Sequence, residues 1–211
     1  RDPNDANELG IGMVHQHFML VPSLTVAENM VLGMVPKKGL FIDHAKAVEI
    51  TKEYAERFNL HVEPEAKVVD IPVGMKQKVE ILKALVRGAK ILILDEPTSG
   101  LDPVSRDDLL DLLRSLCEQD GVSILFSTHI TSDLDACADD VTYLQNGTVA
   151  QSVSLAGFTA PWKKLTGPET ALAPALRGAL RGLRVHRGEF EALYPSDLPC
   201  PAGCREELAD L

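Results

Sequence analysis

Two adjacent carboxylates stand at the end of the most apolar stretch of this chain. Residues 91–94 read Ile-Leu-Ile-Leu, and Asp95 and Glu96 follow at once. Neighbouring acids repel each other, so the pair costs stability unless a cation or a reaction uses it. One carboxylate can ligate Mg²⁺, which prefers oxygen donors, and the next can orient and deprotonate a water molecule. For an Asp-Glu pair alone, a helix cap or a solvated strand end is an equally good interpretation.

A histidine and a glutamine hold comparable places after two other apolar segments. His129 ends the segment 122–129, and Gln16 follows the segment 11–15. Because ligands collect where adjacent parallel strands end, we expect both side chains to face the same crevice as the acids. The imidazole would contact a phosphate or an attacking water, and the glutamine would ligate Mg²⁺ or position water. A lone strand-end histidine is usually structural, so this interpretation depends on the whole set.

Alternating strands and helices position these residues. The segments 90–95 and 122–129 are continuous runs of mostly branched residues, which is typical of strands covered on both faces of a parallel sheet. Helical periodicity at 75–89 and 104–119 supplies the crossover connections. The sequence also predicts a strand at 11–15, a helix at 24–33, a loop at 36–43, a helix at 43–58 capped by Asp43, irregular chain at 61–74, a helix at 131–138 opened by a Thr/Ser cap, a hairpin over 141–152 around Asn146-Gly147 and a solvated helix within 172–188.

Composition narrows the class of protein. The 211 residues, 45% of them hydrophobic, suffice for one domain with an appendage, and the net charge of −10 argues against a dedicated nucleic-acid binder. Four scattered cysteines favour a reducing compartment, and Cys200 and Cys204 alone are weak evidence for zinc. No apolar run reaches the length of a membrane span, and no secretory signal opens the chain.

These motifs together resemble one family. "LILDEPTSGLD" at 92–102 resembles the Walker B motif and D-loop of ATP-binding cassette (ABC) ATPases, "STH" at 127–129 resembles their switch histidine, and "HQHF" at 15–18 resembles their glutamine loop. The resemblance implies an α/β P-loop NTPase fold: a parallel sheet with a helical subdomain at about 24–89. It implies a partial ABC ATPase domain at 1–152 and an accessory segment at 153–211.

The resemblance also implies roles for individual residues. Asp95 becomes the Mg²⁺ carboxylate, Glu96 the general base, His129 the γ-phosphate switch and Gln16 the sensor of the metal and of the transporter. ATP and Mg²⁺ are the implied cofactors. The implied nucleotide-binding residues are Gly74 and Met75 in the place of the signature motif, with Ser99 and Asp102 in the D-loop. Asp102 also has the simpler role of capping the helix from 104.

Two departures from the family pattern alter these expectations. The phosphate-binding motif G-x-x-x-x-G-K-[ST] is missing from the chain, and its place would lie upstream of Arg1, which is not a methionine. We therefore expect an N-terminally truncated ATPase that lacks its first strands and Walker A loop, binds ATP poorly and hydrolyses it at background rate. The signature segment 71–75 reads "IPVGM", in which Pro72 removes a hydroxyl and an amide donor while Gly74 keeps its backbone freedom.

The type of transporter remains open at this level. Residues 10–33 resemble ATPases of simple-sugar and nucleoside importers, whereas 99–113, 126–149 and "RGEFEAL" at 187–193 resemble ATPases of ABC-2-type exporters of peptides or drugs. A recombinant and a divergent member both fit this mixture.

The resemblance implies partners. Apolar residues after Gln16 form either a local core cluster or a groove for a coupling helix of a transmembrane permease subunit. A homo- or heterodimer with another ABC ATPase, no nucleic acid and a peripheral place on the cytoplasmic face of the cell membrane are further expectations. The alternative function is a non-catalytic module that dimerises with an intact ABC ATPase. Cassette proteins of DNA repair or translation fit less well, because the chain has the coupling-type "HQHF" text and lacks basic or coiled-coil insertions.

Overall fold

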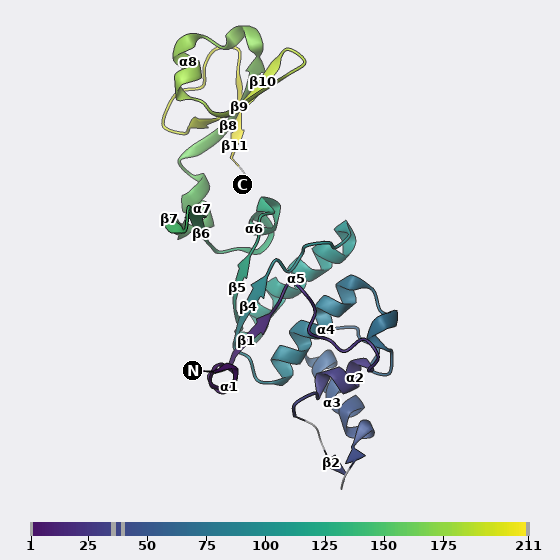
Figure 1. Ribbon diagram of the computed structural model, residues 1–211. Coiled ribbons are helices and arrows are strands. Elements are labelled where there is room, and N and C mark those ends of the chain that lie inside the picture. Colours follow the sequence, from purple (N-terminus) through teal and green to yellow (C-terminus); the bar gives the residue numbers. More distant parts are fainter. Residues whose placement is uncertain (1, 35–36, 39–40, 210–211) are drawn as a thin grey trace. The chain divides into compact units, whose positions relative to one another are not determined.

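The computed structural model describes residues 2–34, 37–38 and 41–209 (Figure 1). Two compact units divide the chain, one of them Arg1–His129 and the other Ile130–Leu211. All four residues of the expected catalytic and metal-binding set fall within the first unit. The domain boundary expected near residue 153 stays a prediction. The division into compact units falls between His129 and Ile130 and does not test it.

Three parallel strands form the sheet of the first unit, in the order β1-β4-β5 (Figure 1). The register pairs Val14 with Leu94, Leu94 with Phe126, and Asp95 with Ser127, so the three carboxyl ends finish nearly level. The strands predicted at 11–15, 90–95 and 122–129, and their parallel arrangement, are confirmed. Their bounds are β1 Ile11–Val14, β4 Ile91–Asp95 and β5 Ser123–Ser127.

Helices α4 (Val73–Val86) and α5 (Pro103–Asp120) cover one face of this sheet. Alternate strand residues such as Leu92 and Leu94 are buried in one core with leucines and valines of both helices. The opposite face carries Met13 and Leu125, which are 52% and 64% exposed. Strands of a parallel sheet are normally covered on both faces, so this second face is unusually apolar for an exposed surface.

Two further helices lie within the segment 24–89, where the helical subdomain is expected, and the subdomain itself stays a prediction. Helix α2 (Val26–Met30) is shorter than the predicted 24–33 and begins with a capping box between Thr25 and Glu28. Helix α3 (His44–Arg57) is capped by Asp43, as predicted.

The connection between α2 and α3 corrects the loop predicted at 36–43. It contains a short antiparallel pair, β2 (Lys37–Lys38) and β3 (Phe41–Ile42). Residues 36, 39 and 40 of that prediction lie outside the described residues.

Two other short elements complete the first unit. Helix α1 (Pro3–Glu8) precedes β1, and a 3₁₀ turn η1 (Val68–Asp70) interrupts the segment predicted to be irregular. Helix α4 begins at Val73, two residues before the predicted start, so the last part of the signature segment is helical.

The second unit contains a hairpin and a four-stranded antiparallel sheet of order β11-β8-β10-β9. The hairpin turns at Asn146 and Gly147, whose φ angles of 51° and 76° suit the tight turn that was predicted. No helix among the described residues is long and apolar enough to cross a membrane. The elements are α6 (Thr131–Cys137), β6 (Asp140–Gln145), β7 (Thr148–Ser154), α7 (Leu155–Thr159), β8 (Trp162–Pro168), η2 (Glu169–Ala171), α8 (Pro174–Ala179), β9 (Arg181–His186), β10 (Glu189–Pro195) and β11 (Arg205–Leu208).

Two predictions for this unit are wrong in part. The N-cap of α6 is Ile130, which makes no side-chain cap hydrogen bond, so Thr131 is already helical. The helix expected within 172–188 stops at Ala179, and residues 181–186 form β9. The reason is long-range, because β9 pairs with β10 through a turn at Arg187 and Gly188, both with positive φ.

Helices α4 and α5 meet at a contact that only glycine allows. A Cβ built on Gly74 would lie 2.8 Å from Ser105 Cβ and 2.9 Å from Ser105 Oγ. Gly74 is buried in the first turn of α4, and Ser105 lies in the first turn of α5. The two helix starts are therefore held closer together than any side chain at position 74 would permit.

We expect Gly74→Ala to destabilise the first unit. Overpacking of this kind costs about 1–3 kcal/mol, and the higher helix propensity of alanine returns about 1 kcal/mol of that. Urea unfolding followed by far-UV circular dichroism measures the loss. The same substitution made in a Ser105→Gly background and compared with Ser105→Gly alone should cost little, and Gly178→Ala, where a Cβ would meet open space, should not destabilise the protein. A cost of Gly74→Ala that is as large in the Ser105→Gly background as in wild type would contradict the proposed steric cause.

Candidate functional site at the carboxyl ends of three strands

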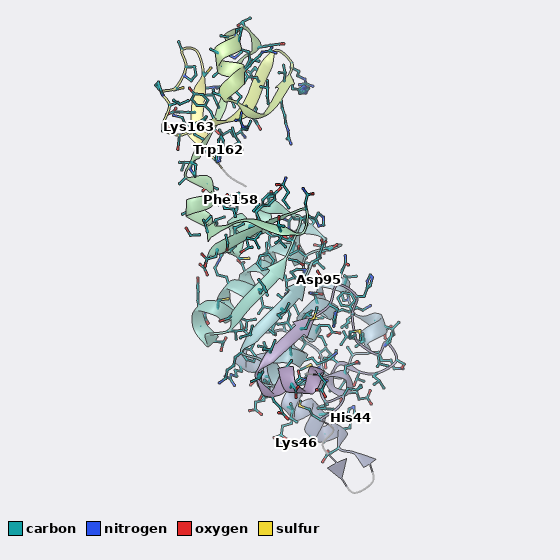
Figure 2. The ribbon with its side chains drawn as sticks, turned by 60° about the vertical axis from the view of Figure 1, so that its left-hand side comes forward. His44, Lys46, Asp95, Phe158, Trp162 and Lys163 are labelled. Atoms are coloured by element: carbon teal, nitrogen blue, oxygen red, sulfur yellow. The ribbon has the colours of Figure 1, made fainter. Side chains whose placement is uncertain are left out.

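Ser127 links the ends of β4 and β5. Its hydroxyl donates a hydrogen bond to Asp95 Oδ1 at 2.7 Å, and its carbonyl oxygen accepts one from the Glu96 amide at 3.1 Å. Asp95, labelled in Figure 2, is the last residue of β4, and Ser127 is the last residue of β5. Asp95 is thus fixed to the neighbouring strand through its carboxylate, and Glu96 is fixed to it through its backbone amide.

Glu96 adopts a backbone conformation that favours glycine. Its φ is +47°, in the left-handed region, where a non-glycine residue costs roughly 1–2 kcal/mol. The chain turns sharply here, and the Ser99 amide donates back to the Glu96 carbonyl at 3.1 Å. Strain of this kind clusters at functional sites, where the surrounding structure enforces it. In this protein it turns the glutamate out of the strand direction immediately after Asp95.

Glu96 and His129 form a direct pair. The His129 Nδ1 atom lies 2.9 Å from Glu96 Oε1, and the imidazole is 69% exposed while the carboxylate is mostly covered. When Nδ1 carries the proton, the imidazole donates to the carboxylate, and its Nε2 can donate to an anion only when it is protonated as well. The arrangement can accept a proton at Glu96, and His129 can contact a water through Nε2 of the neutral ring or an anion through the Nε2–H of the imidazolium.

Gln16 lies at the same edge of the sheet but in a separate groove. It follows the end of β1 by two residues and is exposed. The groove has a volume of about 400 Å³ and is formed by two segments, 16–22 and 68–76. The Val69 amide donates to the Pro22 carbonyl at 3.0 Å, which ties the segments together. The structure therefore brings Asp95, Glu96 and His129 into one cluster and places Gln16 in the lining of the groove, and its membership of the cluster stays a prediction.

Most of the side chains that line the groove are apolar. Its lining residues are Gln16, His17, Phe18, Leu20, Pro22, Val68, Val69 and Lys76. Met19, Val21, Val69 and Val73 add exposed apolar side chains within the same two segments. Phe18 and Leu20 also pack against the core of the first unit, which supports the core-cluster alternative for these two residues. The use of the groove by a coupling helix stays a prediction.

The residues at this edge suit a magnesium ion. Asp95 is exposed, and its carboxylate presents a hard oxygen ligand that is oriented by the Ser127 hydroxyl. Mg²⁺ bound with a nucleotide usually takes one or two protein carboxylates and fills the remaining positions with phosphate oxygens and water. A single oriented aspartate therefore fits this role without a larger cluster of ligands.

The expected nucleotide-binding residues lie around the starts of α4 and α5. Asp102 caps α5 by accepting the Ser105 amide at 3.1 Å, which confirms the predicted cap. Hydrogen bonds from the Ser105 side chain and then its backbone lower the pKa of Asp102. Because Ser105 also contacts Gly74, the structure connects the D-loop to the signature segment through one serine.

The other two residues of this set are placed differently. Met75 is half-buried in the first turn of α4, and Ser99 is exposed in the turn after Glu96. The nucleotide-binding role of all four residues stays a prediction.

Sequence reasoning missed Ser127 as a functional residue. The sequence could have indicated this residue. When the two predicted strands pair in parallel with their ends level, the last residue of β5 stands opposite Asp95. The side chains of Asn29 and Lys83, which hold the glutamine-loop segment, were also missed. Lys83 carries no local signal because its target lies 64 positions away, and the Asn29 bonds to Val21 depend on how the chain between them folds back.

The fold and this cluster define the class. A parallel sheet with an acid pair at one strand end and a histidine at the next agrees with the P-loop fold of ABC ATPases. Residues 2–99 match the family described as "ABC transporter", which identifies this part of the chain as an ABC transporter ATPase domain. The chain is 27% identical to the solved dimeric ATP-binding cassette MJ0796 in a post-hydrolysis state bound to ADP and Pi. That likeness has a TM-score of 0.54 and covers 74% of this chain and 68% of that one.

Similar proteins of known role are importer subunits. The nucleoside import ATP-binding protein NupA of Lactococcus lactis is 45% identical over 157 residues, which are 74% of this chain and 31% of that protein. The guanosine import ATP-binding protein NupO of Bacillus subtilis is 48% identical over 145 residues, or 69% of this chain and 28% of that protein. The chain thus matches less than a third of the length of these relatives.

The lowered pKa of Asp102 makes its cap depend on pH. A carboxyl whose folded-state pKa is depressed stabilises the protein above its unfolded-state value, near 3.9, and loses this effect as pH falls through the folded-state value. We expect Asp102→Ala to be less stable than wild type at pH 7 and the difference to shrink below about pH 4. The midpoints of urea unfolding for both proteins, determined from pH 7 to pH 3, measure this difference in stability.

Asp102→Asn is the matched control for this measurement. Asparagine caps helices about as well as aspartate but does not titrate. The difference between Asp102→Asn and Asp102→Ala should therefore stay constant across the same pH range. A wild-type advantage over Asp102→Ala that is equally large at pH 3 and pH 7 would contradict the assignment.

Proposed function

We propose that this chain is part of the ATP-binding and ATP-hydrolysing subunit of an ABC transporter that imports a nucleoside or a simple sugar. The Glu96–His129 pair beside Asp95 carries the proposal. It places a proton-accepting carboxylate, an imidazole and a carboxylate suited to a metal ion at one edge of the sheet. The importer relatives, matched over 145 to 157 residues, support the direction of transport and the class of solute.

Each residue of the site has a proposed task. Glu96, fixed by its strained turn, accepts a proton from the attacking water, and His129 orients Glu96 and contacts the terminal phosphate. Asp95 would hold Mg²⁺, which neutralises the charge of the phosphates when it is bound. Gln16, which lines the groove, would couple binding of a partner in the groove to the state of the site.

The nucleotide contacts are proposed to come from a dimer. Gly74 and Met75 at the start of α4, with Ser99 and Asp102 before α5, would face a nucleotide held by a second ABC ATPase, either a copy of this chain or a different one. The similar MJ0796 cassette is itself dimeric when bound to ADP and Pi, which supports this arrangement. The N-terminal dipole of α4 would attract phosphate, although Pro72 replaces the serine of the family signature.

A permease subunit is the second proposed partner. The groove of 16–22 and 68–76 has the volume and apolar lining to take a short amphipathic helix, which is an ordinary mode of recognition. Such a partner would hold the protein at the cytoplasmic face of the membrane. The exporter-like text of 99–113 and 126–149 is proposed to reflect a recombinant or divergent ancestry rather than a different cargo.

The phosphate cradle is the element that these 211 residues do not supply. No G-x-x-x-x-G-K-[ST] motif occurs in them, and backbone amides and a lysine of such a loop normally grip the triphosphate. The exposed apolar face with Met13 and Leu125 supports the proposal that a strand–helix unit carrying this loop packs there. The alternative is a non-catalytic module that offers only its signature face to an intact ATPase.

Nucleotide binding separates these possibilities. We expect the 211-residue chain alone to bind MgATP weakly and to hydrolyse it at background rate. Mixed with an intact ATPase subunit of a nucleoside importer, the chain should bind MgATP at least tenfold more tightly than it does alone. If Glu96 is the general base, Glu96→Gln should lower the hydrolysis that this chain adds to the mixture by at least a hundredfold while affinity is retained.

A surface variant and one decisive outcome complete this test. Glu118→Gln, at an exposed position of α5, makes the same chemical change and should leave hydrolysis unaltered. Tight binding in the mixture with no effect of Glu96→Gln would favour the non-catalytic module. Turnover by the isolated chain comparable to an intact ATPase would contradict the proposed need for a phosphate loop.

A further inference from the structure

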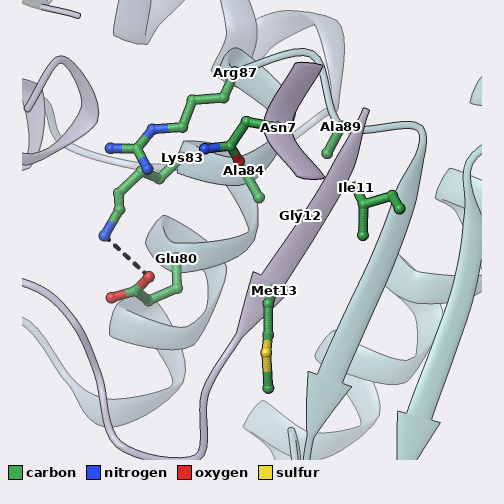
Figure 3. Close-up of a pocket in the computed structure, with 9 residues that line it drawn as sticks. All are labelled: Asn7, Ile11, Gly12, Met13, Glu80, Lys83, Ala84, Arg87 and Ala89. Carbon is green, nitrogen blue, oxygen red and sulfur yellow. Dashed lines mark hydrogen bonds and ion pairs between the residues drawn. The ribbon is translucent and has the colours of Figure 1, made fainter. Parts of the chain in front are cut away.

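A row of charged side chains runs along α4. Glu80, Lys83 and Arg87 follow one another at helical spacing and line a cavity of about 50 Å³ beside β1 (Figure 3). Glu80 is 5% exposed, and the side chain of Lys83 is 12% exposed. Burying an ion pair is expensive, and two apolar residues would often do as well for stability alone. The pair therefore calls for another explanation.

The two cations of this row hold carbonyl oxygens that are distant in sequence. Lys83 Nζ lies 3.2 Å from Glu80 Oε2 and donates to the Met19 carbonyl at 3.1 Å. Arg87 Nη2 donates to the Leu32 carbonyl at 2.6 Å. These carbonyls lie on either side of α2, so α4 fixes both ends of the segment 19–32.

Asn29 holds the same segment from within α2. This asparagine is buried, its Oδ1 accepts the Val21 amide at 2.7 Å, and its Nδ2 donates to the Val21 carbonyl at 3.1 Å. Met19 and Val21 are therefore both pinned by side chains from other elements. Gln16 lies three residues before the first of these anchors and lines the groove.

We propose that Lys83, held in place by Glu80, is a positioning residue that attaches the glutamine-loop segment 16–22 to helix α4. Helix α4 begins in the signature segment, so this anchor makes the groove wall and the signature segment move as one body. Its use in transport rests on the proposed function, whereas the anchor itself can be tested without nucleotide. In the competing explanation, the pair only stabilises the fold as a whole.

Amide hydrogen exchange of the full chain, followed by NMR, distinguishes these explanations. The variant Glu80→Leu/Lys83→Leu removes the anchor and leaves no unpaired charge from this pair in the core. We expect exchange at Val21 to rise at least tenfold, while protection within α5 and the thermal midpoint stay near wild type. Lys83→Arg, which can still reach a carbonyl, should keep protection at Val21 within about twofold of wild type.

Lys78→Leu is the matched control. It removes another lysine of α4, one that pairs with Asp108 on α5 at 3.4 Å. Protection at Val21 should not change in this variant. Should the double variant fail to fold, Glu80→Gln/Lys83→Met compared with Lys83→Arg gives the same contrast without leaving an unpaired charge from this pair.

Two results would overturn the proposal. One is unchanged exchange at Val21 after loss of the pair, and the other is an equal rise at Val21 and throughout α5, which would indicate a purely global effect. Neither result would bear on the nucleotide chemistry of Asp95, Glu96 and His129, so failure here and failure of the proposed function are separable.

Discussion

The level ends of three parallel strands are the constraint on which the rest of this structure depends. Because Asp95 stands opposite Ser127, one serine can hold Asp95 through its hydroxyl and Glu96 through its carbonyl. A shift of one residue in this register would turn the side chains of β5 to the opposite face and separate the pair. The apolar residues that bury one face of the sheet therefore also set the chemistry at its edge.

Helix α4 connects the other functional parts to this sheet. Its first turn touches α5 at Gly74, where Ser105 also binds Asp102, and its largely buried Lys83 holds the glutamine-loop segment. Buried polar groups are expensive unless satisfied, so such contacts specify one arrangement more strongly than apolar packing does. In the first unit, helix α4 thus connects the edge of the sheet, the groove and the starts of α4 and α5.

Local sequence was sufficient for those elements whose signals are local. The strands at 90–95 and 122–129, the caps Asp43 and Asp102 and the turn at Asn146-Gly147 follow from hydrophobic runs, cap chemistry and turn chemistry. The meeting of Glu96 with His129 also follows, once the sheet is taken to be parallel. What could not be predicted depends on distant partners, as with β9, whose strand exists because β10 pairs with it, and Lys83, whose target is the Met19 carbonyl.

The convergence of Asp95, Glu96 and His129 is the central claim, and NMR of the uniformly ¹³C,¹⁵N-labelled chain tests it without any ligand. The account predicts a scalar coupling across the hydrogen bond from the Glu96 amide to the Ser127 carbonyl, together with nuclear Overhauser contacts between the His129 ring and the Glu96 side chain. Absence of both signals in a folded chain, with His129 showing contacts to other residues instead, would contradict it.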